Sequence, residues 1–161
     1  MLFRSIKSMD QLFSPKNKGK IEVLSEMRDT IGIIMSYQGV DISKPFTSDQ
    51  FMNAVDFLKK KINDGFIRQV KGNDYKEDLI SGDAVAVIGW SGDLFQLAIE
   101  NDGKFDFAIP ESGGTISGDN FMVPSTSTKA VEASKLINYY RSEEHTSELQ
   151  SPCNLVCRLL L

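Results

Sequence analysis

The chain has 161 residues, of which 41% are hydrophobic and 25% are charged, proportions typical of one soluble globular domain with a packed core. Its formal net charge of -4 provides no basic surface for nucleic acid. No apolar run is long enough for a membrane-spanning helix, and Met1–Phe13 lacks the apolar core and cleavage site of a signal peptide. Composition therefore argues against a nucleic-acid-binding or membrane-spanning protein.

The first half of the chain alternates between strand and helix signals. Ser25 is expected to cap a helix that Gly39 ends, and Thr47 with Gln50 has the spacing of a capping box. The predicted elements in chain order are a helical turn at Ser8–Phe13, a strand at Lys20–Leu24, a helix at 25–39, a helix at 46–65, a strand at 66–70 and a short helix at 74–83 that Gly82 closes.

The second half continues this alternation. The run "AVAVIGW" at Ala84–Trp90 is continuously apolar, which indicates a strand buried on both faces. The further predicted elements are a helix at 91–101, a strand at 105–110, a glycine-rich turn leading into a strand at 111–124 and a helix at 125–140. Strands that alternate with helices over short connections predict an α/β fold.

The chain ends on "RSEEHTSELQSPCNLVCRLLL", which holds its one histidine, His145, and both cysteines, Cys153 and Cys157. A structural zinc site needs four ligands, usually in tight pairs, and this spacing falls short of that pattern. The same side chains could supply the nucleophile and base of a Cys/His enzyme. The apolar residues 154–161 could form a short helix, although neither a cap nor a breaker frames it.

The codons behind this segment offer a better explanation. Reverse translation of residues 141–151 gives DNA that resembles a common short-read sequencing adapter over its whole length. Residues 154–161 resemble the constant segment that follows the adapter's barcode, and the gap between the two stretches has room for that barcode. We therefore predict that residues 141–161 are adapter-derived and not native, and that their histidine and cysteines carry no function.

Three passages together resemble one protein family: "SEMRD" at 25–29, "LISGDAVAVIGWSGD" at 79–93, and "IPESGGTISGDNFMVPSTSTKAVEASKLINYY" at 109–140. Their order and spacing are similar to those of the spermidine/putrescine-binding proteins of bacterial ABC importers, over essentially all of residues 5–140. The resemblance implies a type II periplasmic-binding-protein-like fold, in which crossing strands join two α/β lobes and the ligand lies in the cleft between them.

On this template the lobe is incomplete. Residues 1–112 correspond to the second lobe, and residues 113–140 to a crossing strand and one helix of the first lobe, whose remainder is missing. The resemblance also implies a non-enzymatic solute-binding subunit, without cofactor or metal, that delivers a polyamine to the membrane subunits of an ABC permease. Its implied location is periplasmic or extracellular, associated with the membrane in the parent protein, whose signal this chain lacks.

The resemblance assigns five ligand-binding residues. Carboxylates pair with the ammonium groups of a polyamine, and an aromatic face covers its methylenes. Trp90 matches the stacking tryptophan, Asp93 and Asp119 match amine-binding aspartates, and Glu26 with Asp29 matches a pair of acidic positions. The alternatives are a core tryptophan at Trp90, a helix cap at Asp93, a turn residue at Asp119, and acids that favour the helix dipole at Glu26 and Asp29.

One position departs from the family pattern. Ser117 stands where a second aromatic residue is frequent, so one stacking wall is lost and a shorter diamine or another cationic solute becomes an alternative to spermidine. Tyr37 and Tyr75 are interpreted as packing residues. A lone glycine pair at Gly113 and Gly114 is a weak indication of a phosphate-binding loop.

Overall fold

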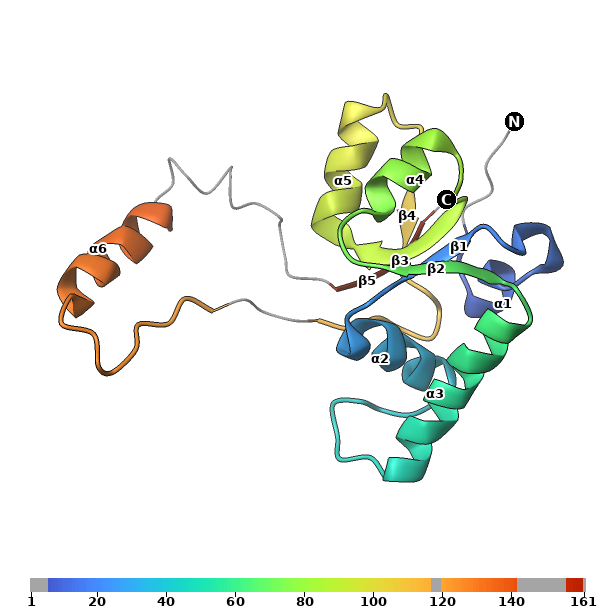
Figure 1. Ribbon diagram of the computed structural model, residues 1–161, viewed down its shortest axis with the longest axis horizontal. Helices are drawn as coiled ribbons and strands as arrows, with labels where there is room; N and C mark the ends of the chain where they lie inside the picture. Colours follow the sequence, from blue (N-terminus) through green and yellow to red (C-terminus); the bar gives the residue numbers. More distant parts are fainter. Residues whose placement is uncertain (1–5, 117–119, 142–155, 161) are drawn as a thin grey trace.

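The structure is a computed structural model that describes residues 6–116, 120–141 and 156–160, the last range as backbone only (Figure 1). Its helices are α1 (Met9–Leu12), α2 (Met27–Tyr37), α3 (Ser48–Asn63), α4 (Tyr75–Ser81), α5 (Ser91–Glu100) and α6 (Ala130–Tyr140), with a 3-10 turn at Pro15–Asn17. Its strands are β1 (Ile21–Leu24), β2 (Ile67–Lys71), β3 (Ala86–Trp90), β4 (Phe107–Ala108) and β5 (Val156–Leu160). The predicted α/β class is confirmed.

The strands form one sheet in the order β2-β1-β3-β5-β4. β1 pairs in parallel with β2 and with β3, and the register places Ile21 opposite both Ile67 and Ala86. β5 runs antiparallel between β3 and β4. The helix considered for residues 154–161 is therefore wrong, because Val156–Leu160 is a strand. The adapter origin of residues 141–161 stays a prediction.

Helices cover both faces of the parallel strands (Figure 1). On one face, Val23 and Ile88 belong to a core shared with α2 and α3. On the other, Leu24 and Val87 belong to a second core shared with α4 and α5. The prediction of a strand buried on both faces is confirmed, because the side chains of Ala86, Val87 and Ile88 are all 0% exposed.

The helix ends explain the local boundaries. In the predicted capping box, Thr47 Oγ1 accepts a hydrogen bond from the backbone N–H of Gln50 at 3.2 Å, and Gln50 Oε1 accepts one from Thr47 N–H at 2.8 Å. Ser25 was the wrong cap for α2, since the N-cap residue is Glu26. The reason lies in the sheet: Ser25 N–H donates to the carbonyl of Lys71 at 2.8 Å, which extends the β1–β2 ladder by one residue.

The strand predicted after β4 is absent from the described residues. No strand occurs within 111–116 or 120–124, the described parts of the predicted strand at 111–124. α6 stands away from the sheet (Figure 1), contains no buried residue, and exposes Val131 and Leu136. Residues 111–116 and 120–124 therefore pair with no strand in the described part of the chain. The boundary between two lobes after residue 112 stays a prediction. Among the described helices, none is long and apolar enough to cross a bilayer.

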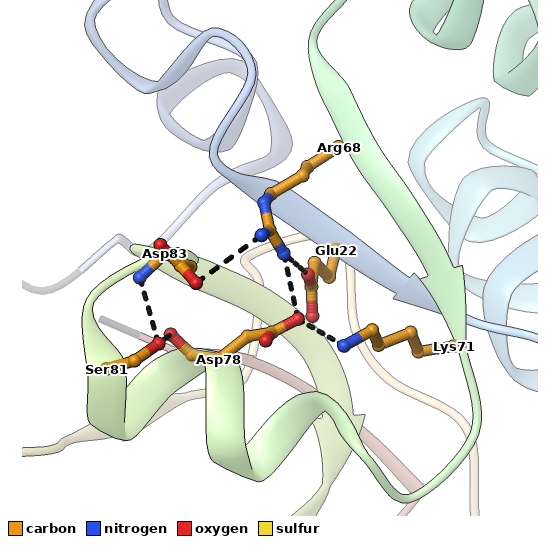
Figure 2. A network of polar contacts seen from close by, with 6 residues as sticks. All are labelled: Glu22, Arg68, Lys71, Asp78, Ser81 and Asp83. Carbon is orange, nitrogen blue, oxygen red and sulfur yellow. Dashed lines mark hydrogen bonds and ion pairs between the residues drawn. The ribbon is translucent and has the colours of Figure 1, made fainter.

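A charged network lies on the α4 face of β1 and β2 (Figure 2). Arg68 Nη1 contacts Glu22 Oε1 and Asp78 Oδ2, each at 2.9 Å. Lys71 forms a second, short ion pair with Asp78, and Arg68 Nη2 lies 3.5 Å from Asp83 Oδ2. The Glu22 side chain is fully buried, and its Oε2 has no hydrogen-bond partner.

Candidate ligand-binding site

The candidate site lies where β1 and β3 end and α2 and α5 begin. Parallel neighbouring strands place their carboxyl ends at the same edge of a sheet, the usual position of binding residues in α/β folds. Thr30 ties α2 to this edge, because its Oγ1 donates a 2.6 Å hydrogen bond to the carbonyl of Leu24, the last residue of β1. The sheet therefore sets the distance between the first turns of the two helices.

Trp90 and Asp29 meet across this edge. Trp90 Nε1 donates to Asp29 Oδ2 at 2.8 Å, although the two residues lie 61 positions apart in the sequence. Asp29 is only 8% exposed. Burial raises the pKa of its carboxyl group, the hydrogen bond from Trp90 opposes this, and nearby Glu26 adds to the increase. The structure thus brings two predicted site residues into direct contact.

Trp90 is half-buried and packs partly against the α4–α5 core, which agrees with the alternative of a core tryptophan, and its role in ligand binding stays a prediction. It also occupies the N-cap position of α5. The indole edge is held by Asp29, and the ring lies 6.2 Å from that of Tyr75, measured between centroids. An aromatic side chain fixed in this way can present a face to a ligand without first being ordered.

Asp93 lies in the first turn of α5. Its Oδ2 accepts a 2.9 Å hydrogen bond from the Tyr75 hydroxyl, and its Oδ1 lies 3.4 Å from Lys76 Nζ. The same Tyr75 oxygen accepts a 3.3 Å hydrogen bond from Trp90 N–H. Asp93 is not the cap of α5, because the N-cap residue is Trp90, but it is the acid in the first turn of the helix, where it favours the helix dipole.

Sequence reasoning treated Tyr75 only as a packing residue and did not consider Lys76. Tyr75 does pack, because it is 0% exposed, but its hydroxyl also joins two predicted site residues. The one available signal was general: a buried tyrosine hydroxyl usually needs a polar partner.

The other predicted residues are less closely connected. Glu26 is exposed and accepts a 3.2 Å hydrogen bond from Ser25 Oγ, at the start of α2. Asp119, together with Ser117, lies outside the described residues, so its role stays a prediction. His145 and Cys153 also lie outside them. Within the described part of the chain, no cluster of histidine, cysteine and acidic side chains could hold a metal ion.

A cavity of about 520 Å³ lies beside Asp29. Its walls are mainly apolar and include Met35 of α2, Phe46, Phe51, and Ile116 after β4, although Arg28 also lines it beside Asp29. A buried carboxylate next to apolar walls is suited to a group that joins a positive charge to methylenes, because the charge is paired while the hydrocarbon leaves water.

The bacterial extracellular solute-binding protein family matches residues 2–151. This chain is a member of that family. Among curated relatives, the putrescine-binding periplasmic protein PotF of Escherichia coli (strain K12) is 27% identical over 144 residues, which cover 83% of this chain and 38% of PotF. The resemblance expected from the sequence is confirmed.

Solved structures confirm the type II periplasmic-binding-protein-like fold. The spermidine/putrescine ABC transporter substrate-binding protein PotD from Streptococcus pneumoniae, in complex with calcium and HEPES, has a TM-score of 0.68 at 20% identity, over 90% of this chain and 44% of that one. A putative spermidine/putrescine ABC transporter from Listeria monocytogenes has a TM-score of 0.76 at 21% identity, over 88% and 42%. The chain spans about two fifths of the length of these relatives. The family consists of bacterial extracellular solute-binding proteins rather than enzymes.

Proposed function

We propose that this chain is part of an extracytoplasmic subunit that binds a polyamine between two lobes and delivers it to an ABC permease. Residues 1–112 supply the second lobe, and residues 113–140 lead into the first. The observation that carries the proposal is the contact of Trp90 with Asp29 beside Asp93, at one edge of the sheet. The name of the curated relative, a putrescine-binding protein, supports it.

The chemistry of the site suits an ammonium group. Trp90 offers a ring face, which attracts a cation within about 6 Å of its centroid. Asp29 provides a carboxylate bonded to the indole N–H, and Asp93 provides one linked to the Trp90 backbone through the Tyr75 hydroxyl. Burying an unpaired cation is costly, so binding requires these carboxylates to converge on the nitrogen. Ligand contacts to both lobes then shift the population toward the closed form, which docks on the permease.

Putrescine titration tests the proposal. The proteins are the two-lobed parent, encoded by the native DNA around these codons, and the present chain, whose single tryptophan is Trp90. Quenching or shift of tryptophan fluorescence is expected in the parent, with weak or no binding by residues 1–140 alone. Failure of the parent to bind putrescine, spermidine or a related diamine would refute polyamine binding, whereas micromolar binding by the short chain would refute the need for two lobes.

Substitutions locate the site within the parent. Trp90→Ala and Asp119→Asn are both expected to weaken binding strongly, and unchanged affinity in both would remove them from the site. Asp29→Asn keeps an oxygen that can accept from the Trp90 indole but loses the charge, whereas Asp29→Ala loses both. If a ligand ammonium pairs with Asp29, both variants should bind putrescine with similarly low affinity. If Asp29 only orients the Trp90 indole, the affinity of Asp29→Asn should stay near that of the wild type.

A diamine is the preferred ligand within this class. Ser117 stands where the resemblance leads us to expect a second aromatic residue, which would cover additional methylenes. The expected order of affinity is therefore putrescine above spermidine, and isothermal titration with both ligands measures it.

A further inference from the structure

The first turn of α4 controls the Asp93 carboxylate from two sides. Tyr75 donates from its hydroxyl to Asp93 Oδ2 at 2.9 Å. Lys76, the next residue, places its ammonium group 3.4 Å from Asp93 Oδ1. Both oxygens of the carboxylate thus have a partner from α4.

Tyr75 has the properties of a positioning residue. It is 0% exposed, and burial together with the nearby Asp93 charge raises its pKa well above the ordinary value, which keeps the hydroxyl neutral and able to donate. The same oxygen accepts from Trp90 N–H at 3.3 Å. One hydroxyl therefore fixes the carboxylate relative to the backbone of the stacking residue.

Gly89 makes this close approach possible. A Cβ atom at position 89 would lie 3.1 Å from the nearest atom of the Tyr75 ring, closer than ordinary carbon contacts of about 3.5–4.0 Å. The ring lies over β3 because the strand has no side chain at that point.

Lys76 differs from Tyr75 in its exposure to solvent. Its side chain is 39% exposed and that of Asp93 is 27% exposed, so the pair resembles surface ion pairs, which contribute little net free energy. Its ammonium group has the same chemistry as the end of a polyamine and contacts a carboxylate assigned to ligand binding.

We propose that α4 sets the affinity of the site for ammonium groups through Asp93: Tyr75 holds one carboxylate oxygen in place, and Lys76 neutralises the other until a ligand ammonium replaces it. This inference rests on the proposed function and identifies an internal competitor within the same site. Removing the lysine charge is therefore expected to tighten cation binding, whereas weaker binding would mean that Lys76 is itself a ligand contact.

The test is putrescine titration of the two-lobed protein carrying Lys76→Gln, with Lys59→Gln as the matched control. Lys59 is an exposed lysine of α3, on the other face of the sheet, and its loss changes the net charge equally. Lys76→Gln is expected to lower Kd about two- to fivefold, and Lys59→Gln to leave it unchanged. The effect of Lys76→Gln should disappear in an Asp93→Asn background, because the competitor then has no carboxylate to occupy.

Tyr75→Phe tests the positioning role and is expected to raise Kd by about three- to tenfold. An additional Lys76→Gln change should still tighten binding in that variant, which separates loss of position from misfolding. If the wild-type parent binds putrescine but Lys76→Gln leaves its Kd unchanged or raises it, this inference is wrong while the proposed function stands. If the wild-type parent binds no amine, the proposed function fails and this inference with it.

Discussion

Glu22→Gln is the substitution that best tests the energetics of this fold. Glu22 is a fully buried acid in the middle of β1, and its network contains three carboxylates but only two cations, Arg68 and Lys71 (Figure 2). Burial, and then the contact with Asp78, raise the pKa of Glu22 to about 6 from an ordinary value of 4.5. Glu22 Oε2 has no hydrogen-bond partner, and the interaction of the Glu22 side chain with Asp78 favours the neutral acid, whose O–H can donate to a carboxylate.

Asp78 stays charged throughout the relevant range. The hydrogen bond from Lys71, followed by that with Glu22, lowers the pKa of Asp78 to about 2. Between pH 4.5 and pH 7.5 the proton therefore leaves Glu22 and not Asp78. A neutral Glu22 balances two carboxylates against two cations, whereas an ionised one adds an uncompensated buried charge.

The sign and size of the pH effect follow from this. The pKa of Glu22 in the folded state lies above its unfolded value, so the fold prefers the protonated form. The associated stability is fully present below pH 4.5 and is lost as the pH rises through about 6. The difference of about 1.5 between the folded and unfolded pKa of Glu22 corresponds to about 2 kcal/mol of folding free energy. Glutamine cannot ionise, and its amide can donate to Asp78 and accept from Arg68, so the variant should escape this loss.

Urea unfolding of the 161-residue chain between pH 4.5 and pH 7.5 measures the effect, with the single tryptophan, Trp90, as the fluorescent reporter. The free energy of unfolding of Glu22→Gln minus that of the wild type should rise by up to about 2 kcal/mol across this range. Glu77→Gln, which changes an exposed acid in the same helix as Asp78, should give a flat difference. A difference for Glu22→Gln that stays flat or falls with pH would refute the reasoning.

Three further substitutions test packing and polar contacts by the same unfolding measurement. Gly89→Ala places a methyl group against the Tyr75 ring and should cost about 1–3 kcal/mol; no loss would mean that the ring moves freely. Asn17→Ala removes the side-chain amide that donates to two carbonyl groups at the end of α1, at 3.0 and 2.9 Å, with an expected loss of about 1–3 kcal/mol. Lys61→Gln removes an ammonium group that lies 4.8–5.2 Å from the centroids of three phenylalanine rings and should cost about 0.5–2 kcal/mol. Lys59→Gln, on the exposed side of the same helix, is its control.

Local patterns predicted the elements that lie within one stretch of sequence. The apolar run that ends at Trp90 indicated a buried strand, and the Thr47–Gln50 spacing indicated a capping box; both are present. These predictions succeed because the relevant contacts span only a few residues. The cap of α2 was displaced from Ser25 because a long-range hydrogen bond to β2 decided where the strand ended.

The candidate site was only partly predictable for the same reason. Sequence resemblance pointed to Trp90, Asp29 and Asp93, but their mutual contacts depend on how β1 and β3 align. Tyr75 and Lys76 carry no local signal, because their importance comes from a carboxylate 17 or 18 positions away. Glu22 is similar: nothing in a four-residue strand reveals that its partners come from β2 and α4.

The contacts of Trp90 also bear on how the proposed cleft would work. The residue is held at two points, since its indole N–H donates to Asp29 and its backbone N–H donates to Tyr75. Ordering a free side chain on binding costs about 0.5–1.5 kcal/mol. Trp90 is already ordered by its two hydrogen bonds, so binding should not require this cost again. In the proposed two-lobed protein, Trp90 then needs little rearrangement on binding. Its contacts would favour the open and closed forms alike, so the differential affinity that drives closure is expected to come mainly from groups on the first lobe. We therefore expect Trp90 to act as a preorganised surface, and the equilibrium between open and closed forms of the proposed two-lobed protein to depend mainly on the first lobe.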